Sequence, residues 1–359
     1  MLFRSLTFLL VDYSCALKLS SPATYLTAIK AASNQGIVIK GSNSLDEYAQ
    51  VDTFVFDKTG TLTTGVPKIQ RIIAYEGYDD EEVLRIAACL EEHFYHPIAT
   101  AVVKKAEDEG IEHEEMHGKL THVASKGIVS SIDGKRVVIG SLELLEDEKT
   151  IISNEQKAVI EEYSQKYNLL YLSYDGKLIA IFLIDTPLRG EAIALLKELK
   201  EKGKQIVLLT GDTQKRTETI CSLIPFDRVY TQVKPEQKHQ VIEQLQEEGH
   251  HVLMIGDGIN DSAALSLANV GIVMAGASDI ARQASDILFL NEQLTGLEVL
   301  ENITEQLNRQ LDANLKHTVG INSFLMGLGL IDVVSPSLLA VLHNVTTTFI
   351  IGKSLTYIQ

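Results

Sequence analysis

A carboxylate at the end of a buried strand is the group in this sequence best placed for covalent chemistry. Residues 53–56 read Thr-Phe-Val-Phe and predict a buried strand, which delivers Asp57 to a turn that contains Lys58 and Thr59. In open α/β sheets, the reacting groups lie at the carboxyl ends of the strands. A carboxylate at such a point can attack a phosphoryl group and hold it as an aspartyl-phosphate.

Two later runs offer groups that suit a phosphoryl group. A predicted strand at residues 205–209 leads into Thr210, Gly211 and Asp212, where the hydroxyl and nearby backbone amides can hold phosphoryl oxygens. Lys238, in the run Pro-Glu-Gln-Lys, can neutralise the charge that grows on a phosphoryl group in transfer. Alone, such a triplet is usually just a turn and such a lysine is usually solvated, so the order of the runs carries the argument.

A fourth run supplies candidate ligands for a metal ion. The predicted strand at residues 252–255 is followed by Asp257 and, four residues later, Asp261 on a tight turn. Carboxylate oxygens are hard donors that suit Mg²⁺. Asp257 and Asp261 are therefore candidate magnesium ligands.

The composition limits the other possibilities. The chain has 359 residues, 45% of them hydrophobic, which is enough for two or three domains. The net charge is −16, and no basic tract stands out, so we expect no nucleic-acid partner. Cys15, Cys89 and Cys221 are far apart and form no disulfide framework, which suits a reducing compartment.

The strands that carry these groups are interrupted by a region of different character. After about residue 178, strands and helices alternate, with strands at 179–184, 205–209, 252–255 and 270–273, which predicts a doubly wound parallel sheet. Between 66 and 178 we instead expect an inserted α+β domain. Its predicted elements are helices at 81–92 and 98–109 and strands at 127–132 and 136–139, joined by an Asp-Gly hairpin turn.

Apolar stretches lie at both ends of the chain. Residues 3–19, 318–334 and 337–352 each approach the roughly 20 residues that cross a bilayer. For the first, a secretory signal is the alternative, which the charges of Asp12 and Lys18 disfavour. For the last two, a buried helical hairpin is the alternative, although their glycines and short connection favour a membrane hairpin.

The order of the four runs resembles the haloacid dehalogenase-like catalytic domain, and the run Asp-Lys-Thr-Gly-Thr-Leu-Thr resembles one branch of it, the P-type ATPases. Soluble phosphatases of that superfamily carry a second acid two residues after the nucleophile, and here that position is Thr59. Without this acid, the aspartyl-phosphate should hydrolyse slowly, as suits a pump. The resemblance implies ATP and Mg²⁺ as cofactors, with Mg²⁺ held by Asp57, Asp257 and the Thr59 carbonyl.

The insertion resembles the ATP-binding domain of the heavy-metal subfamily. Its His-Pro pair is matched by His96 and Pro97, while Tyr95 replaces the family's acid; the alternative for His96 is a helix-start residue. Its Gly-x-Gly loop is degenerate here, with Ser125 in the first position and Gly127 retained, and a downstream glycine is kept as Gly140. Asp185 resembles the acid of an Asp-x-x-Arg region near the nucleotide, with an N-cap for a helix beginning at Arg189 as the simpler explanation.

The N-terminal run resembles the subfamily's sixth membrane helix, with Tyr-Ser-Cys in place of Cys-Pro-Cys. Cys15 and Asp12 are therefore candidates for holding the transported ion. The C-terminal hairpin supplies Asn322 and His343 as further candidates, with helix–helix hydrogen bonding as the alternative for Asn322. Zn²⁺, Mn²⁺, Fe²⁺, Co²⁺ and Cd²⁺ stay open, and the missing Cys-Pro-Cys argues against copper.

The resemblance implies an organisation in five segments. These are a transmembrane helix and stalk at 1–30, a stalk and first part of the phosphorylation domain at 31–65, the nucleotide-binding domain at 66–178, the second part of the phosphorylation domain at 179–300, and a stalk with a two-helix membrane hairpin at 301–359.

We therefore expect the C-terminal half of a pump that moves a transition-metal ion across a lipid membrane, with its catalytic domains in the cytoplasm. The family's Thr-Gly-Glu actuator loop is absent, so the missing half is a candidate partner, and a complete cycle by this chain alone is doubtful. The alternatives are a soluble phosphatase, or a truncated non-transporting remnant or split-pump subunit.

Overall fold

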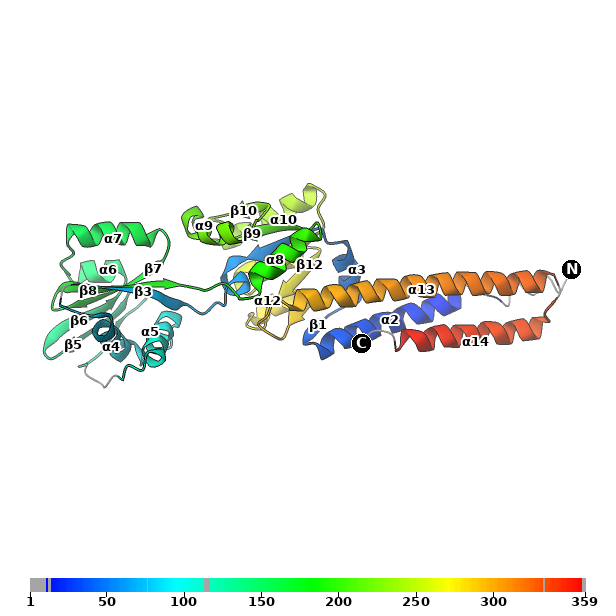
Figure 1. Ribbon diagram of the computed structural model, residues 1–359, viewed down its shortest axis with the longest axis horizontal. Coiled ribbons are helices and arrows are strands. Elements are labelled where there is room, and N and C mark those ends of the chain that lie inside the picture. Colours follow the sequence, from blue (N-terminus) through cyan, green and yellow to red (C-terminus); the bar gives the residue numbers. More distant parts are fainter. Residues whose placement is uncertain (1–10, 12–13, 76, 113–116, 332, 357–359) are drawn as a thin grey trace. The chain divides into compact units, whose positions relative to one another are not determined.

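The computed structural model describes residues 11, 14–75, 77–112, 117–331 and 333–356 (Figure 1). The chain divides into two compact units. One consists of Met1–Phe56, Ala194–Val207 and Pro235–Gln359, and the other of Asp57–Ile193 and Leu208–Lys234. Two of the four boundaries in sequence fall inside strands, and one of these strands ends at Asp57.

A seven-stranded sheet holds the predicted catalytic strands. Its order is β1-β13-β12-β11-β2-β9-β10. Strands β2, β11, β12 and β13 pair in parallel, with Val55 opposite Met254, whereas β1 pairs antiparallel to β13. The bounds are β1 Ile37–Ile39, β2 Thr53–Asp57, β9 Gln205–Leu209, β10 Arg228–Tyr230, β11 Val252–Gly256, β12 Val270–Val273 and β13 Ile287–Phe289. The predicted α/β fold with a parallel sheet is confirmed.

Helices connect these strands in the alternation that the sequence predicts. They are α3 Asn43–Gln50, α8 Ala192–Glu201, α9 Gln214–Leu223, α10 Lys238–Glu247, α11 Ser262–Leu267 and α12 Asp279–Ala284. Strands β2, β11 and β12 are buried along their whole length. Because both faces of such strands are covered, they appear in the sequence as unbroken apolar runs.

A six-stranded sheet is inserted between β2 and β9. Its order is β3-β8-β7-β6-β5-β4, and all its pairings are antiparallel. The strands are β3 Lys68–Ala74, β4 Thr121–Val123, β5 Gly127–Ile132, β6 Lys135–Gly140, β7 Asn168–Tyr174 and β8 Lys177–Asp185. Helices α4 (Asp80–Glu91) and α5 (Pro97–Asp108) cover one face, and α6 (Leu142–Asp147) and α7 (Asn154–Ser164) cover the other (Figure 1).

The predicted hairpin between β5 and β6 is confirmed. Ile132 pairs with Lys135, and the two turn residues, Asp133 and Gly134, have φ angles of +51° and +78°. A two-residue turn with two positive φ angles matches the twist of the strands that it joins, which is why Asp-Gly is a strong hairpin signal.

Strand β8 lies in a different sheet from the one that its sequence predicts. The run at 179–184 predicts a strand of the parallel sheet, but β8 pairs with β3 and β7 in the inserted sheet, so the insertion extends to Asp185. Ile181 and Leu183 pack into one core of that sheet, and Phe182 and Ile184 into the other. A strand buried on both faces is apolar throughout, so its sequence resembles a parallel strand.

Three helices run side by side at the ends of the chain (Figure 1). They are α2 (Ser14–Asn34), α13 (Gly296–Leu330) and α14 (Pro336–Ser354). The turn between α13 and α14 lies at the predicted break, where the Ser335 hydroxyl accepts from Leu338 N and Pro336 takes the first helical position.

The sequence predicts membrane-spanning segments at 318–334 and 337–352, which fall in α13 and α14, and at 3–19, most of which lies outside the described residues. Among the described residues, no helix has both the length and the apolar character needed to cross a bilayer. The physical reason is the polar content of the two C-terminal helices, such as Lys316 and Asn322 in α13 and His343 in α14.

Candidate active site

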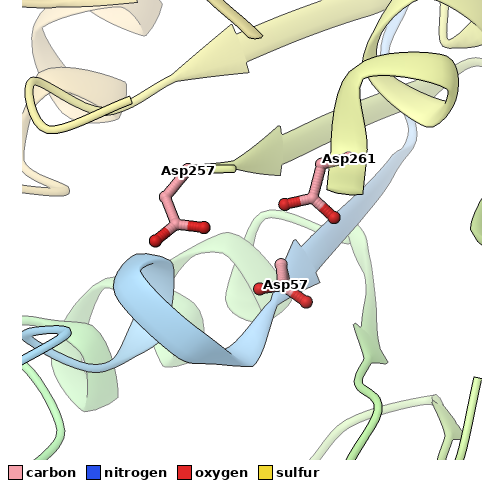
Figure 2. Close-up of side chains that lie close together, drawn as sticks. All are labelled: Asp57, Asp257 and Asp261. Atoms are coloured by element: carbon pink, nitrogen blue, oxygen red, sulfur yellow. The ribbon is translucent and has the colours of Figure 1, made fainter. Parts of the chain in front are cut away.

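Three carboxylates converge at the end of the seven-stranded sheet (Figure 2). Asp57 is the last residue of β2, Asp257 follows β11, and Asp261 ends the turn after it. One ligand oxygen of each lies within 4.8 Å of the others. Because β2 and β11 are parallel neighbours, their ends place Asp57 and Asp257 side by side. Such a set of oxygen donors fits a hard divalent cation.

Asp261 has a second partner in addition to this cluster. Its Oδ1 lies 2.6 Å from Lys238 Nζ, and both side chains are buried. Gly256 makes room for the carboxylate, since a Cβ at that position would lie 2.7 Å from Asp261 Oδ2. The structure thus brings Lys238 to the carboxylate cluster through Asp261.

The turn after Asp57 is held from outside by a buried arginine. Gly60 has φ +72°, a conformation that favours glycine. Arg189 is buried and donates from Nε to Thr61 O at 2.7 Å and from a terminal nitrogen to Gly60 O at 3.0 Å. No local sequence signal reveals these contacts, because Arg189 lies beyond the insertion.

The second predicted turn lies at the end of β9, the neighbour of β2 in the sheet. Thr210 is buried, and its hydroxyl accepts from Asp212 N at 3.1 Å. Asp212 forms an ion pair with Lys58. Gly211 lies between them and is exposed. The turn thus contains a buried hydroxyl and a carboxylate that fixes the lysine after Asp57.

A cavity of about 490 Å³ lies in the inserted domain. Gly127 and Gly140 line it and pair across β5 and β6. A Cβ at Gly127 would lie 2.2 Å from Ile139 O, and one at Gly140 would lie 2.2 Å from Lys126 O. Their φ angles are +142° and +157°. Side chains are therefore excluded at both positions, which keeps this wall of the cavity flat.

His96 and Pro97 lie where the wall of this cavity meets the start of α5. His96 lines the cavity, and its Nδ1 also accepts from Ile98 N at 3.3 Å, while Pro97 is the first residue of the helix. The helix-start explanation and the cavity position thus both hold. Tyr95 lines the cavity and is fully exposed, and the Phe94 ring stacks on His122 with centroids 5.3 Å apart.

Glu91 is a cavity residue that the sequence did not single out. Its side chain is only 7% exposed, and burial raises the pKa of its carboxyl to about 7. It is the last residue of α4 and follows the apolar run Ala-Ala-Cys-Leu. The sequence signal that could have identified Glu91 is an acidic residue that directly follows an apolar run. At neutral pH this carboxyl can both donate and accept hydrogen bonds.

Asp185 is not among the residues that line this cavity. It borders a smaller cavity of about 110 Å³ that Lys58, Thr59 and Asp212 also line. The alternative, that Asp185 caps a helix beginning at Arg189, is wrong, since α8 begins at Ala192. The Asp185 carboxylate instead accepts from Thr186 N at 2.8 Å, because the chain turns directly after β8.

The residues predicted to hold a transported ion are only partly described. Asn322 Oδ1 and His343 Nδ1 are 3.2 Å apart, and both side chains are buried. Cys15 lies in the first turn of α2, and its side chain is not described. Asp12 lies outside the described residues.

Comparisons with known proteins give one consistent result. Residues 51–269 match the family model of haloacid dehalogenase-like hydrolases. The chain is 33% identical over 355 residues to a zinc-exporting P-type ATPase of Mycobacterium marinum and 32% identical to a manganese-exporting P-type ATPase of Mycobacterium bovis. These alignments cover 98% of this chain but 48% and 49% of the relatives, so the chain spans about half their length.

A solved structure shows the same likeness in three dimensions. A zinc-transporting PIB-type ATPase in an E2·Pi state superimposes with a TM-score of 0.84 and 25% identity. The match covers 96% of this chain and 56% of that one. The homology to heavy-metal P-type ATPases therefore extends over nearly the whole chain.

Proposed function

The chain belongs to the haloacid dehalogenase-like hydrolases, and on that premise we propose that it transfers the γ-phosphoryl group of ATP to Asp57 as the catalytic part of a metal-exporting P-type ATPase. The observation that carries the proposal is the cluster of Asp57, Asp257 and Asp261 at the ends of paired parallel strands. A carboxylate nucleophile beside two further carboxylates needs a cation to offset their charge.

Asp57 acts as the nucleophile. One carboxylate oxygen attacks the γ-phosphorus in line, the bond from that phosphorus to the bridging oxygen breaks, and ADP leaves with the bonding electrons. Lys238, held by Asp261, supplies positive charge toward the three phosphoryl oxygens. Thr210 contributes a buried hydroxyl at the neighbouring strand end.

Magnesium fits the donor set in this structure. Asp57, Asp257 and the Thr59 carbonyl would hold it, and Asp261 borders the same cluster with its carboxylate shared with Lys238. When bound, Mg²⁺ neutralises charge on the phosphates during transfer. The proposal thus gives Asp257 and Asp261 different roles.

Thr59 accounts for the fate of the phosphorylated Asp57. Hydrolysis of an acyl phosphate needs a group that activates water, and the side chain two residues after the nucleophile is here a hydroxyl with no basic function at neutral pH. The phosphorylated chain should therefore persist. Such persistence suits a cycle in which the stored energy drives movement of an ion.

The cavity of the inserted domain is the proposed site of the nucleotide. Its volume and its mixture of flat glycine wall, aromatic rings and one buried carboxyl are suited to a planar, hydrogen-bonding base. His96, Gly127 and Gly140 line it. Asp185 borders the smaller cavity next to Thr59, where it is suited to the polar end of the nucleotide.

The transported ion is proposed to be a transition metal. The relatives above are named as zinc and manganese exporters, and the buried Asn322–His343 pair offers nitrogen and oxygen donors. Cys15 and Asp12 stay in the proposed ion site by resemblance. The proposal further includes a lipid membrane, cytoplasmic catalytic domains, and an actuator-containing half as partner.

Labelling with γ-³²P-ATP and Mg²⁺ tests the phosphoryl transfer. We expect a label on the chain that is stable in acid, is released by hydroxylamine and is lost in Asp57→Asn. Asp279→Asn, an exposed acid at the start of α12, is the matched control and should keep the label. An unlabelled wild-type chain, or a label that survives in Asp57→Asn, contradicts the proposal.

A further inference from the structure

A line of buried polar side chains runs along α13. Gln310, Asn314, Thr318 and Asn322 follow one another at intervals of four residues, and each is at most 2% exposed. Residues four apart on a helix share one face, so these four form a polar stripe about 18 Å long. Buried polar groups are costly unless they bind a partner, which makes each of them informative.

At the N-terminal end of this stripe, Gln310 and Asn314 belong to a hydrogen-bond network. Gln310 Nε2 donates to Asn314 Oδ1 at 2.9 Å. Asn314 Nδ2 donates to Ser354 Oγ at 2.9 Å and to Thr24 Oγ1 at 3.4 Å. At the C-terminal end of the stripe, Asn322 pairs with His343. Thr318 lies between them, one helical turn from each.

The spacing of residues along two antiparallel helices places Ser20 of α2 at the level of Thr318. Asn314 contacts Thr24, and further along α13 Leu325 packs with Val11, so the two helices run in opposite directions. Thr318 follows Asn314 by four residues, and Ser20 precedes Thr24 by four. The two hydroxyls are therefore one turn beyond the Asn314 network on facing helices.

Both hydroxyls are fully buried and lack a hydrogen-bond partner among the described residues. Other hydroxyls of these helices behave differently: those of Thr24, Thr304 and Ser354 each donate to the carbonyl four residues earlier. An alanine or valine would avoid the cost of burying an unpaired hydroxyl. The pair is thus better explained by a ligand than by packing.

We propose that Ser20 and Thr318 form a binding site for a partly hydrated divalent cation of the Mn²⁺ or Zn²⁺ class, which takes oxygen atoms as ligands. The cation would occupy this site on its way to or from the Asn322–His343 pair. The inference rests on the proposed metal transport. Two neutral hydroxyl oxygens replace only part of a hydration shell, so the site binds weakly, as an intermediate position on a path requires. The polar residues on either side provide continuous donors along the stripe.

Mn²⁺ binding to the full chain tests this site. Free Mn²⁺ is measured by its electron paramagnetic resonance signal, with excess Mg²⁺ and an Asp257→Asn background that removes the carboxylate cluster as a Mn²⁺ site. We expect Ser20→Ala and Thr318→Val each to weaken binding about tenfold, because each removes one oxygen donor to a charged ligand. Thr304→Val, a buried threonine of the same helix that donates to Leu300 O, is the control and should bind as the parent does.

Thermal unfolding separates a cation from a structural water. With chelator, Thr318→Val should equal or exceed the parent in Tm, and the Tm gain on adding Mn²⁺ should largely disappear. A variant whose Tm falls equally with and without Mn²⁺ would show that the hydroxyl serves a structural water and would overturn the proposal, as would equal Mn²⁺ affinity in all variants.

The two proposals fail in different ways. Asp57 labelling without any Mn²⁺ binding outside the carboxylate cluster leaves phosphoryl transfer intact and overturns the cation site. Mn²⁺ binding that depends on Ser20 and Thr318, in a wild-type chain that takes no label, supports the cation site and contradicts the proposed phosphoryl transfer.

Discussion

Replacing Glu91 by glutamine should remove a pH-dependent loss of stability. Burial raises the pKa of this carboxyl from an ordinary value of 4.5 to about 7 in the folded chain. Between these values the folded state holds a proton that the unfolded state has released. The protonated Glu91 carboxyl therefore stabilises the folded state relative to the unfolded state. This stabilisation is fully present below 4.5, the pKa in the unfolded chain, and is lost as the pH rises through about 7.

The size of the effect follows from the difference between the two pKa values. Each unit corresponds to about 1.4 kcal/mol, so the full loss is about 3 kcal/mol, most of it between pH 5 and pH 8. Glutamine has nearly the same shape and no charge to bury. The free energy of unfolding of Glu91→Gln, relative to wild type, should therefore rise by about 2–3 kcal/mol from pH 5 to pH 8.

Urea unfolding at several pH values, followed by circular dichroism, measures this difference. Hydrogen exchange of β5 and β6 then shows that the change arises in the domain that contains Glu91. Glu107→Gln, an exposed acid on α5, is the control and should follow the wild-type pH profile. Parallel profiles for Glu91→Gln and wild type would refute the reasoning, because they would mean that the Glu91 carboxyl is as well solvated in the fold as in the unfolded chain.

Three further substitutions test the geometry of the sites. Gly256→Ala places a Cβ 2.7 Å from Asp261 Oδ2 and should slow labelling by ATP about 100-fold, whereas Gly276→Ala, at an open position after β12, should label normally. Lys238→Met leaves the buried Asp261 charge unpaired and should lower the free energy of unfolding by about 3–5 kcal/mol in urea titrations; an unchanged midpoint would contradict the buried ion pair. Gly127→Ala forces a Cβ against Ile139 O and should weaken ATP binding at least about tenfold by calorimetry, so wild-type affinity would show that the nucleotide binds elsewhere.

The parts of the fold with strong local patterns could be predicted from the sequence. Strands β9 and β12 begin and end as predicted, and the Asp-Gly hairpin has the expected positive φ angles. Asp57 and Asp257 could be placed near each other because both follow apolar runs, and parallel strands end at one edge of a sheet.

The missed features depend on contacts between distant segments. Strand β8 belongs to the inserted sheet because it pairs with β3 and β7. Its sequence is apolar throughout and does not indicate which strands it pairs with. Arg189 holds the turn after Asp57 from beyond the insertion, and Lys238 meets Asp261 from another helix. Glu91 appears in sequence as an ordinary acid at a helix end, and only its burial changes its chemistry.

The interruption of the seven-stranded sheet also has a consequence for folding kinetics. Strand β2 pairs with β11, and the whole inserted domain lies between them in the sequence. During synthesis, Thr53 can therefore pair with Val252 only after the inserted domain has been translated. The inserted sheet, by contrast, is built from one continuous stretch of chain whose strands mostly pair with sequence neighbours. Contacts between distant residues form slowly because a long loop must close first. We therefore expect the cavity of the inserted domain to form early, and the carboxylate cluster to be among the last features to assemble.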